Sequence, residues 1–251
     1  MSNTQHPQHN GSTSVGGSNK ATPAVVAIVV AACIAAIVAI AFLLPQDDDG
    51  GASGEAVGST GTPGDCGDAP PPPAEPQQFG EAPATAKAEG TTFEAVLATN
   101  CGDITVELYG DKAPQTVASF NFLSQEGFYD DSPCHRLTTS GIFVLQCGDP
   151  TGTGQGGPGY EFGVENPPTD GIYPTGTLAM ARGQEPNTNG SQFFIVYDDT
   201  ELPDPNGYSI FGKVTAGMEV VDYVAEQGVA AEAGEQPAQP ISVLGITVSE
   251  K

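Results

Sequence analysis

Basic residues are scarce in this chain. Lysine and arginine together number seven, against 31 aspartates and glutamates, and the formal net charge at pH 7 is -24. A surface with this charge repels phosphate groups, which argues against sequence-independent binding to nucleic acid or to anionic lipid headgroups. The only two arginines are Arg136 and Arg182, so each is a candidate for a specific role.

Several chemical motifs are also missing. No Cys-x-x-Cys occurs, which argues against a thiol-disulfide oxidoreductase, and the cysteine spacings fit no zinc site. The glycine-rich run 152–159 lacks the Gly-Lys-Ser/Thr ending of a phosphate-binding loop, and no helical pattern follows it. We therefore expect neither a metal site nor a cofactor, and we expect His135 to pack or hydrogen-bond inside the domain.

The N-terminal part of the chain does not read as a globular fold. Residues 1–22 are polar, with Lys20 as their only basic residue, and are predicted to be a disordered cytoplasmic tail. Residues 23–44 are uncharged and apolar, long enough at about 1.5 Å per residue to cross a hydrocarbon core of ~30 Å. Because Lys20 precedes this run and three aspartates follow it at 47–49, we expect a single-pass cell-membrane helix with the remainder outside.

Processing of this apolar run is an alternative. A cleaved secretory signal has a shorter apolar region that ends at small residues. The stretch 30–33, Val-Ala-Ala-Cys, resembles a lipoprotein processing site, although apolar or small residues continue from Cys33 to Leu44. Residues 45–91 follow with aspartates, Gly-Ser steps and a proline tract at 70–73, and they are predicted to be a disordered linker.

From residue 92 to 251 the pattern changes to short alternating runs. Ile104, Val106 and Leu108 alternate with polar residues, which predicts a half-buried strand, whereas Val117 and Phe120 recur at helical spacing. The predicted strands lie near 93–99, 104–109, 133–138, 143–148, 177–181, 192–197, 210–214 and 244–248, and the helices near 114–125 and 218–224. Eight mostly antiparallel strands with two helices predict a mainly β fold, a closed barrel capped by the helices, although spacing alone does not exclude a sandwich.

Three blocks of sequence carry a family resemblance. Residues 134–137 read Cys-His-Arg-Leu and residues 143–149 read Phe-Val-Leu-Gln-Cys-Gly-Asp. Residues 187–195 read Asn-Thr-Asn-Gly-Ser-Gln-Phe-Phe-Ile, with Phe-Gly-Lys-Val after them at 211–214. In this order, the segment from about residue 92 to 250 resembles the cyclophilin-type peptidyl-prolyl cis/trans isomerases. The turn at 138–141 is longer than in the common family pattern, as in some bacterial members, so a different pocket rim is expected.

The resemblance implies an isomerase that needs no nucleophile. Rotation about a peptidyl-prolyl bond crosses a barrier of about 20 kcal/mol because amide resonance is lost. A catalyst therefore grips the proline, desolvates the bond and donates a hydrogen bond to the imide nitrogen of the twisted state. On the family pattern, that donor is Arg136.

The resemblance also assigns the substrate-binding residues. Phe143, Val144, Phe194 and Leu202 would form the walls of the proline pocket. Gln146 and Gln192 would hold the substrate or the arginine by hydrogen bonds, and Ala181, Arg182 and Tyr208 would contact the substrate backbone. Family members usually have Ala-Asn at 181–182, and the change from asparagine leaves the role of Arg182 open. Many have a histidine at 208, and the phenol of Tyr208 can donate a hydrogen bond in its place. Animal members have tryptophan at 202, a contact for cyclosporin, so weak binding of that drug is expected.

Four of the five cysteines lie beyond the apolar run, where disulfides persist if this part is outside the cell. Cys134 and Cys147 flank two strands that an antiparallel pairing places opposite each other, which favours a disulfide between them over free thiols. Cys66 with Cys101 is the second predicted pair, which would tie the linker to the first hairpin.

The leading prediction is a monomeric isomerase that acts on proline-containing polypeptides as exported or surface proteins fold. The alternative is a non-catalytic peptide-binding or chaperone module on the same barrel, which the changes at Arg182 and Leu202 favour. Arg136, Phe143, Gln146 and Phe194 argue for catalysis.

Overall fold

The computed structural model describes residues 64–231 and 234–251. Its first hairpin joins β1 (Thr92–Thr99) to β2 (Gly102–Tyr109), with Thr99 opposite Gly102 and Ala95 opposite Val106. Ile104, Val106 and Leu108 of β2 are buried while the residues between them are partly exposed. The apolar alternation in the sequence therefore sets the face that β2 turns to the core.

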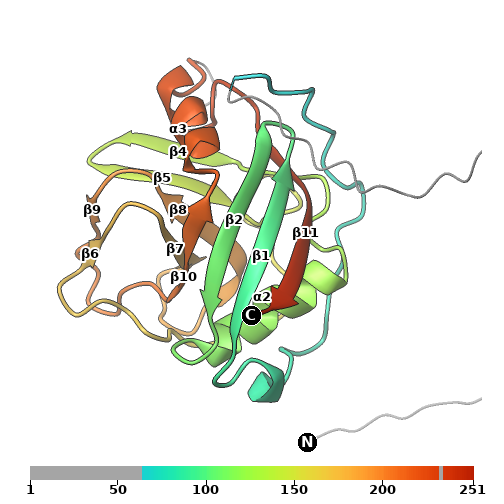
Figure 1. Ribbon diagram of the computed structural model, residues 1–251, viewed down its shortest axis with the longest axis vertical. Coiled ribbons are helices and arrows are strands. Elements are labelled where there is room, and N and C mark those ends of the chain that lie inside the picture. Colours follow the sequence, from blue (N-terminus) through green and yellow to red (C-terminus); the bar gives the residue numbers. More distant parts are fainter. Residues whose placement is uncertain (1–63, 232–233) are drawn as a thin grey trace, which may run out of the picture. The chain divides into compact units, whose positions relative to one another are not determined.

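Nine strands form the main sheet (Figure 1). Their order is β3-β11-β1-β2-β10-β7-β8-β5-β4, and every neighbouring pair is antiparallel. The remaining strands of this sheet are β3 (Ser132–Pro133), β4 (Arg136–Ser140), β5 (Ile142–Cys147), β7 (Thr177–Arg182), β8 (Asn189–Val196), β10 (Ile210–Ala216) and β11 (Ser242–Glu250). A separate pair consists of β6 (Ile172–Tyr173) and β9 (Thr200–Glu201).

Within residues 64–231 and 234–251, the eight predicted strands correspond to the eight strands longer than two residues, and two α-helices accompany them, so the mainly β prediction is confirmed. The prediction of a closed barrel is not confirmed. The main sheet curls as a half-barrel, and within the described residues its end strands β3 and β4 form no ladder with each other. The two edges are consecutive in the chain: only Cys134 and His135 separate β3, which pairs with β11, from β4. The chain therefore passes from one edge to the other without a ladder between them.

Two α-helices pack on this sheet. Helix α2 (Pro114–Gln125) begins with a proline, which fits the first helical turn, and buries Val117, Phe120 and Leu123. It lies against β11, whereas α3 (Met218–Gln227) lies beside β2 (Figure 1). A short 3₁₀ turn, η1 (Thr85–Lys87), contacts α2. The helices therefore shield core side chains that the curled sheet alone leaves open.

The described part of the predicted linker, residues 64–91, lies on the domain and is not a free tether. Cys66 is disulfide-bonded to Cys101, and the ring of Phe79 meets that of Phe122 edge-on at 4.9 Å between centroids. The Phe79 N–H also donates to the carbonyl oxygen of Pro158 at 2.7 Å. The composition missed this because a single aromatic residue and a single cysteine attach a stretch that is otherwise polar and proline-rich.

The predicted tail at 1–22, the predicted membrane helix at 23–44 and residues 45–63 of the predicted linker lie outside the described residues. Among the helices that the structure does describe, none has both the length and the apolar character that a membrane span requires.

Candidate active site

A cavity of about 130 Å³ opens on the outer face of the sheet, where β4, β5, β8 and β7 run side by side. Its lining residues are Arg136, Ile142, Val144, Gln146, Ala181, Arg182, Phe194, Leu202 and Tyr208. Eight of the ten predicted site residues are among them. The cavity is well below the size of about 300 Å³ at which drug-sized pockets begin, so it suits one side chain.

The strand register explains why these residues meet. Arg136 is directly opposite Gln146, Gln146 is opposite Phe194, and Phe194 is opposite Ala179. Residues directly opposite each other on neighbouring strands point to the same face of a sheet. The row therefore places a cation, an amide and an apolar ring on one surface.

The apolar floor of the cavity is a small cluster separate from the main core. Val144 and Phe194 are buried in it together with Tyr173, Ala179 and Val196, and Leu202 packs against them. An apolar group that packs on this floor is removed from water, which stabilises binding by about 25 cal/mol per Å² of apolar surface buried.

The position of Phe143 departs from the prediction. Its ring stacks edge-on against Tyr197, with 5.9 Å between centroids, and it is absent from the cavity lining, where Ile142 takes the place beside Val144. Successive residues of a strand point to opposite faces, so Phe143 and Val144 cannot both face the cavity. Strict alternation from Val144 and Gln146 would have identified Ile142.

Arg136 belongs to a chain of polar contacts. Its Nε donates to the Glu235 carboxylate at 2.5 Å and its Nη1 to Oε1 of Gln146 at 3.4 Å. The Gln146 amide then donates to Gln192 at 2.8 Å, and the Gln192 amide donates to the carbonyl oxygen of Gly156, also at 2.8 Å. These contacts orient the guanidinium. Its Nη2 makes no hydrogen bond to the described residues and stays available as a donor.

Gln192 faces a second cavity, of about 780 Å³, which adjoins the first because Gln146, Ala181 and Arg182 line both. Its walls are polar: they include the backbone of the glycine-rich run 154–159 and, from the segment before β1, Gln78. The Gln78 side chain donates to the carbonyl oxygen of Gly157 at 2.8 Å. The predicted linker thus contributes one wall of this cavity.

The glycine-rich run is folded around Asp149. This carboxylate accepts hydrogen bonds from the N–H groups of Thr151 at 2.8 Å and Gly156 at 3.0 Å. Burial opposes its ionisation, but these hydrogen bonds bring the pKa of Asp149 below its ordinary value. A Cβ on Gly156 would lie 2.0 Å from the carboxylate, so glycine is required there. The run therefore forms a fixed wall of the larger cavity.

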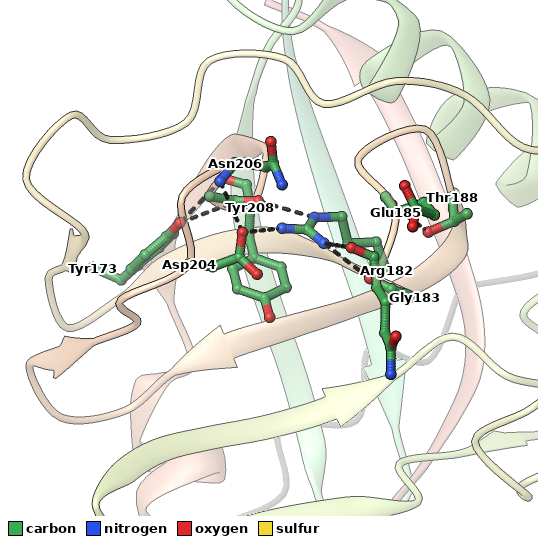
Figure 2. Close-up of polar contacts among 10 residues, drawn as sticks. Tyr173, Arg182, Gly183, Glu185, Thr188, Asp204, Asn206 and Tyr208 are labelled. Atoms are coloured by element: carbon green, nitrogen blue, oxygen red, sulfur yellow. Dashed lines mark hydrogen bonds and ion pairs between the residues drawn. The ribbon is translucent and has the colours of Figure 1, made fainter.

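The side chain of Arg182 is engaged with the protein itself. It is 1% exposed and pairs with Asp204, and Figure 2 shows it joined to the loop that carries Tyr208. Tyr208 lines the cavity and lies edge-on to Phe194, with 5.6 Å between centroids. Sequence reasoning missed Asp204 and Glu235 because each acts on its arginine from a distant loop without any local motif.

Both predicted disulfides are present. Cys134 is bonded to Cys147, and Cys66 to Cys101. The Cys134–Cys147 bond ties the segment between β3 and β4 to the last residue of β5, close in sequence to Arg136 and Gln146. Across the part of the chain that the structure describes, no three His, Cys, Asp or Glu side chains gather closely enough to hold a metal ion.

Comparison with known proteins adds independent information. The family model "Cyclophilin type peptidyl-prolyl cis-trans isomerase/CLD" matches residues 95–248. "Probable peptidyl-prolyl cis-trans isomerase B" of Mycobacterium leprae is 43% identical over 178 residues, covering 66% of this chain and 58% of that protein. The protein of the same name in Mycobacterium tuberculosis is 46% identical over 165 residues, covering 60% and 52%. The matched part thus spans a little over half the length of these curated relatives.

Solved structures agree in fold. A crystal structure of a Cryptosporidium parvum cyclophilin-type isomerase is 32% identical and superposes with a TM-score of 0.55, covering 64% of this chain and 99% of that one. A second structure of the same protein, in the presence of the dipeptide Ala-Pro, gives 33% identity and a TM-score of 0.54.

Proposed function

The chain belongs to the cyclophilin-type peptidyl-prolyl cis-trans isomerase family, and on that premise we propose that the domain at 92–251 accelerates rotation about Xaa-Pro bonds of polypeptides. The supporting observation is the meeting of Arg136 with the apolar floor formed by Val144 and Phe194 in one small cavity. The names of the relatives from Mycobacterium support the same reaction.

In the proposed mechanism, the proline ring enters the cavity of about 130 Å³ and rests on its apolar floor. As the C–N bond twists, its resonance is lost and the nitrogen becomes able to accept a hydrogen bond. Arg136 supplies that bond through Nη2, the group left without a partner among the described residues, while Glu235 and Gln146 hold the rest of the guanidinium. A donor fixed beforehand costs no reorganisation when charge develops.

The flanking peptide has a path across the site. Because the two cavities share Gln146, Ala181 and Arg182, an extended chain with its proline in the small cavity passes over the larger polar one. Its polar walls suit backbone amides and hydrophilic side chains. The second cavity therefore holds residues next to the proline, with little selection for apolar ones.

A protease-coupled isomerisation assay with Xaa-Pro tetrapeptides tests this function. The full chain should accelerate cis-to-trans conversion in proportion to its concentration. Binding of proline peptides without acceleration would instead support the alternative, a non-catalytic peptide-binding module.

We also propose that the domain works outside the cell membrane, on exported or surface proteins. The uncharged run at 23–44 has the length of a membrane span. One disulfide within the domain and a second from the domain to Cys66 suit an oxidising compartment. Membrane fractionation with protease protection tests this. The full chain should pellet with membranes, and its domain should be digested from the outer side. Recovery of most of the chain in the soluble fraction would count against an anchor.

A further inference from the structure

Arg182 ends β7 between the two cavities, yet its guanidinium turns into the protein (Figure 2). Nε donates to the carbonyl oxygen of Gly207 at 3.0 Å, Nη1 to those of Gly183 at 2.9 Å and Gln184 at 3.2 Å, and Nη2 to the Asp204 carboxylate at 2.5 Å. A guanidinium has five N–H donors, and four hydrogen bonds here occupy all three nitrogens. Little of it remains for a substrate.

The same guanidinium covers the ring of Tyr208, with 4.8 Å between its carbon and the ring centroid. The ring also meets Phe194 edge-on, and the Tyr208 N–H donates to the hydroxyl of Tyr173 at 2.8 Å. A cation over an aromatic face is an attractive contact. Tyr208 is therefore held at the ring by Arg182 and Phe194 and at the backbone by Tyr173.

Asp204 links this contact to the loop that leads to Tyr208. Its Oδ1 also accepts the N–H of Asn206 at 2.8 Å, and its carbonyl oxygen accepts the N–H of Gly207 at 3.1 Å. Asp204 is absent from the lining of both cavities. Any influence of Asp204 on substrate must therefore act through Arg182 or through the loop.

We propose that Arg182 and Asp204 form a clamp that positions the Tyr208 hydroxyl at the rim of the proline cavity, so that Arg182 acts on catalysis through Tyr208 and not as a substrate ligand. The proposal rests on the isomerase function. It explains how an arginine replaces the usual asparagine at this position: its length lets the side chain turn away from the substrate and anchor the opposite loop. The Arg182 side chain is buried in this ion pair. Removing Asp204 alone would leave a buried charge without its partner, which is destabilising.

A set of variants tests the clamp: Arg182→Ala, Asp204→Ala, Tyr208→Phe, and each of the first two combined with Tyr208→Phe. Tyr208→Phe removes the hydroxyl and keeps the ring against the guanidinium. Each of the three single variants should lower kcat by about five- to tenfold, the effect of one hydrogen bond, with KM changed less than twofold. In the Tyr208→Phe background, Arg182→Ala and Asp204→Ala should have almost no further effect on kcat.

Two results would overturn the clamp. A rise in KM with unchanged kcat for Arg182→Ala, together with an Asp204→Ala protein that behaves as wild type, would make Arg182 a direct substrate ligand. Effects of Arg182→Ala and Tyr208→Phe that multiply in the double variant would show that Arg182 does not act through Tyr208. Asp199→Ala is the matched control, because its carboxylate binds Thr175 in a different loop; it should leave both constants unchanged.

Amide hydrogen exchange separates failure of the clamp from failure of the isomerase function. Exchange at the amides of Asn206, Gly207 and Tyr208 should become faster in Asp204→Ala and stay unchanged in Asp199→Ala. The milder Asp204→Asn should give an intermediate rate if Asp204→Ala proves unstable. Unchanged exchange in both Asp204 variants would refute the clamp. This measurement decides the matter even if the wild-type chain shows no isomerase activity, a result that would refute only the proposed function.

Discussion

The guanidinium of Arg136 donates through Nε to the carboxylate of Glu235 at 2.5 Å, although the two residues are 99 positions apart. The loop that carries Glu235 also contacts the sheet through its backbone: the N–H of Leu137 donates to the carbonyl oxygen of Glu235. The segment between α3 and β11 therefore contacts both the side chain of Arg136 and the strand that carries it. Arg136 has a partner on each side, Glu235 and Gln146.

Glu235→Gln should lower kcat/KM by about fivefold at most. The two side chains are 34% and 57% exposed, and ion pairs of this exposure contribute about 0.2–1 kcal/mol. The loss should shrink as salt is added, because exposed charges are screened. Glu219→Gln, at an exposed position on α3, is the control. A drop of a hundredfold in Glu235→Gln would show that Glu235 takes a direct part in the reaction.

Loss of the Cys134–Cys147 bond should destabilise the domain. The bond closes a loop with a sequence separation of 13, and crosslinks of about this size contribute about 3 kcal/mol. The Cys134→Ser/Cys147→Ser double variant should therefore unfold at lower urea concentration than the wild type. Mass spectrometry of non-reduced fragments should link Cys134 to Cys147 and Cys66 to Cys101. Recovery of alkylated Cys134 and Cys147 without reductant would refute the first bond.

His135 should make the domain less stable as the pH falls below neutrality. Burial lowers the pKa of its imidazole below the ordinary 6.5; the Asp149 carboxylate opposes this shift and the Arg136 guanidinium adds to it. The unfolded chain thus binds a proton that the folded chain does not. This group's contribution to stability is complete above pH 6.5 and declines as the pH drops toward the folded-state pKa.

Urea unfolding at pH values from 7.5 to 5.5 measures this effect, with His135→Gln as the control. The wild type should lose free energy of unfolding over this range, and the variant should lose less. Equal losses in both proteins would mean that His135 titrates normally.

Cyclosporin should inhibit weakly, because Leu202 lines the cavity where animal members of the family have tryptophan. Leucine lacks the indole N–H donor and much of the ring area. Leu202→Trp should tighten inhibition in the isomerisation assay. An unchanged inhibition constant would mean that residue 202 is not the drug contact.

The sequence predicted the long elements of this fold well because their signals are local. The alternation of Ile104, Val106 and Leu108 identifies β2 from one stretch of chain, as do Val117 and Phe120 for α2. The two-residue strands β3, β6 and β9 have no such pattern. They exist only because a distant segment offers hydrogen-bonding partners.

The site was predictable as far as the motifs reach. Arg136 and Phe194 belong to the sequence blocks that resemble the family, and both line the small cavity. The partners that orient the two arginines, Glu235 and Asp204, come from loops whose approach depends on the whole fold. Phe143 lies outside the small cavity because the alternation of β5 turns Ile142 and Val144 to that face instead.

The most direct test of the proposed mechanism is the catalytic efficiency of Arg136→Ala on a Xaa-Pro tetrapeptide, with circular dichroism to confirm folding. If one fixed hydrogen bond to the twisted amide contributes about 3 kcal/mol, efficiency should fall by about a hundredfold or more. Lys213→Ala, which removes an exposed cation from β10, should leave it unchanged. A folded Arg136→Ala protein with near wild-type efficiency would contradict the account.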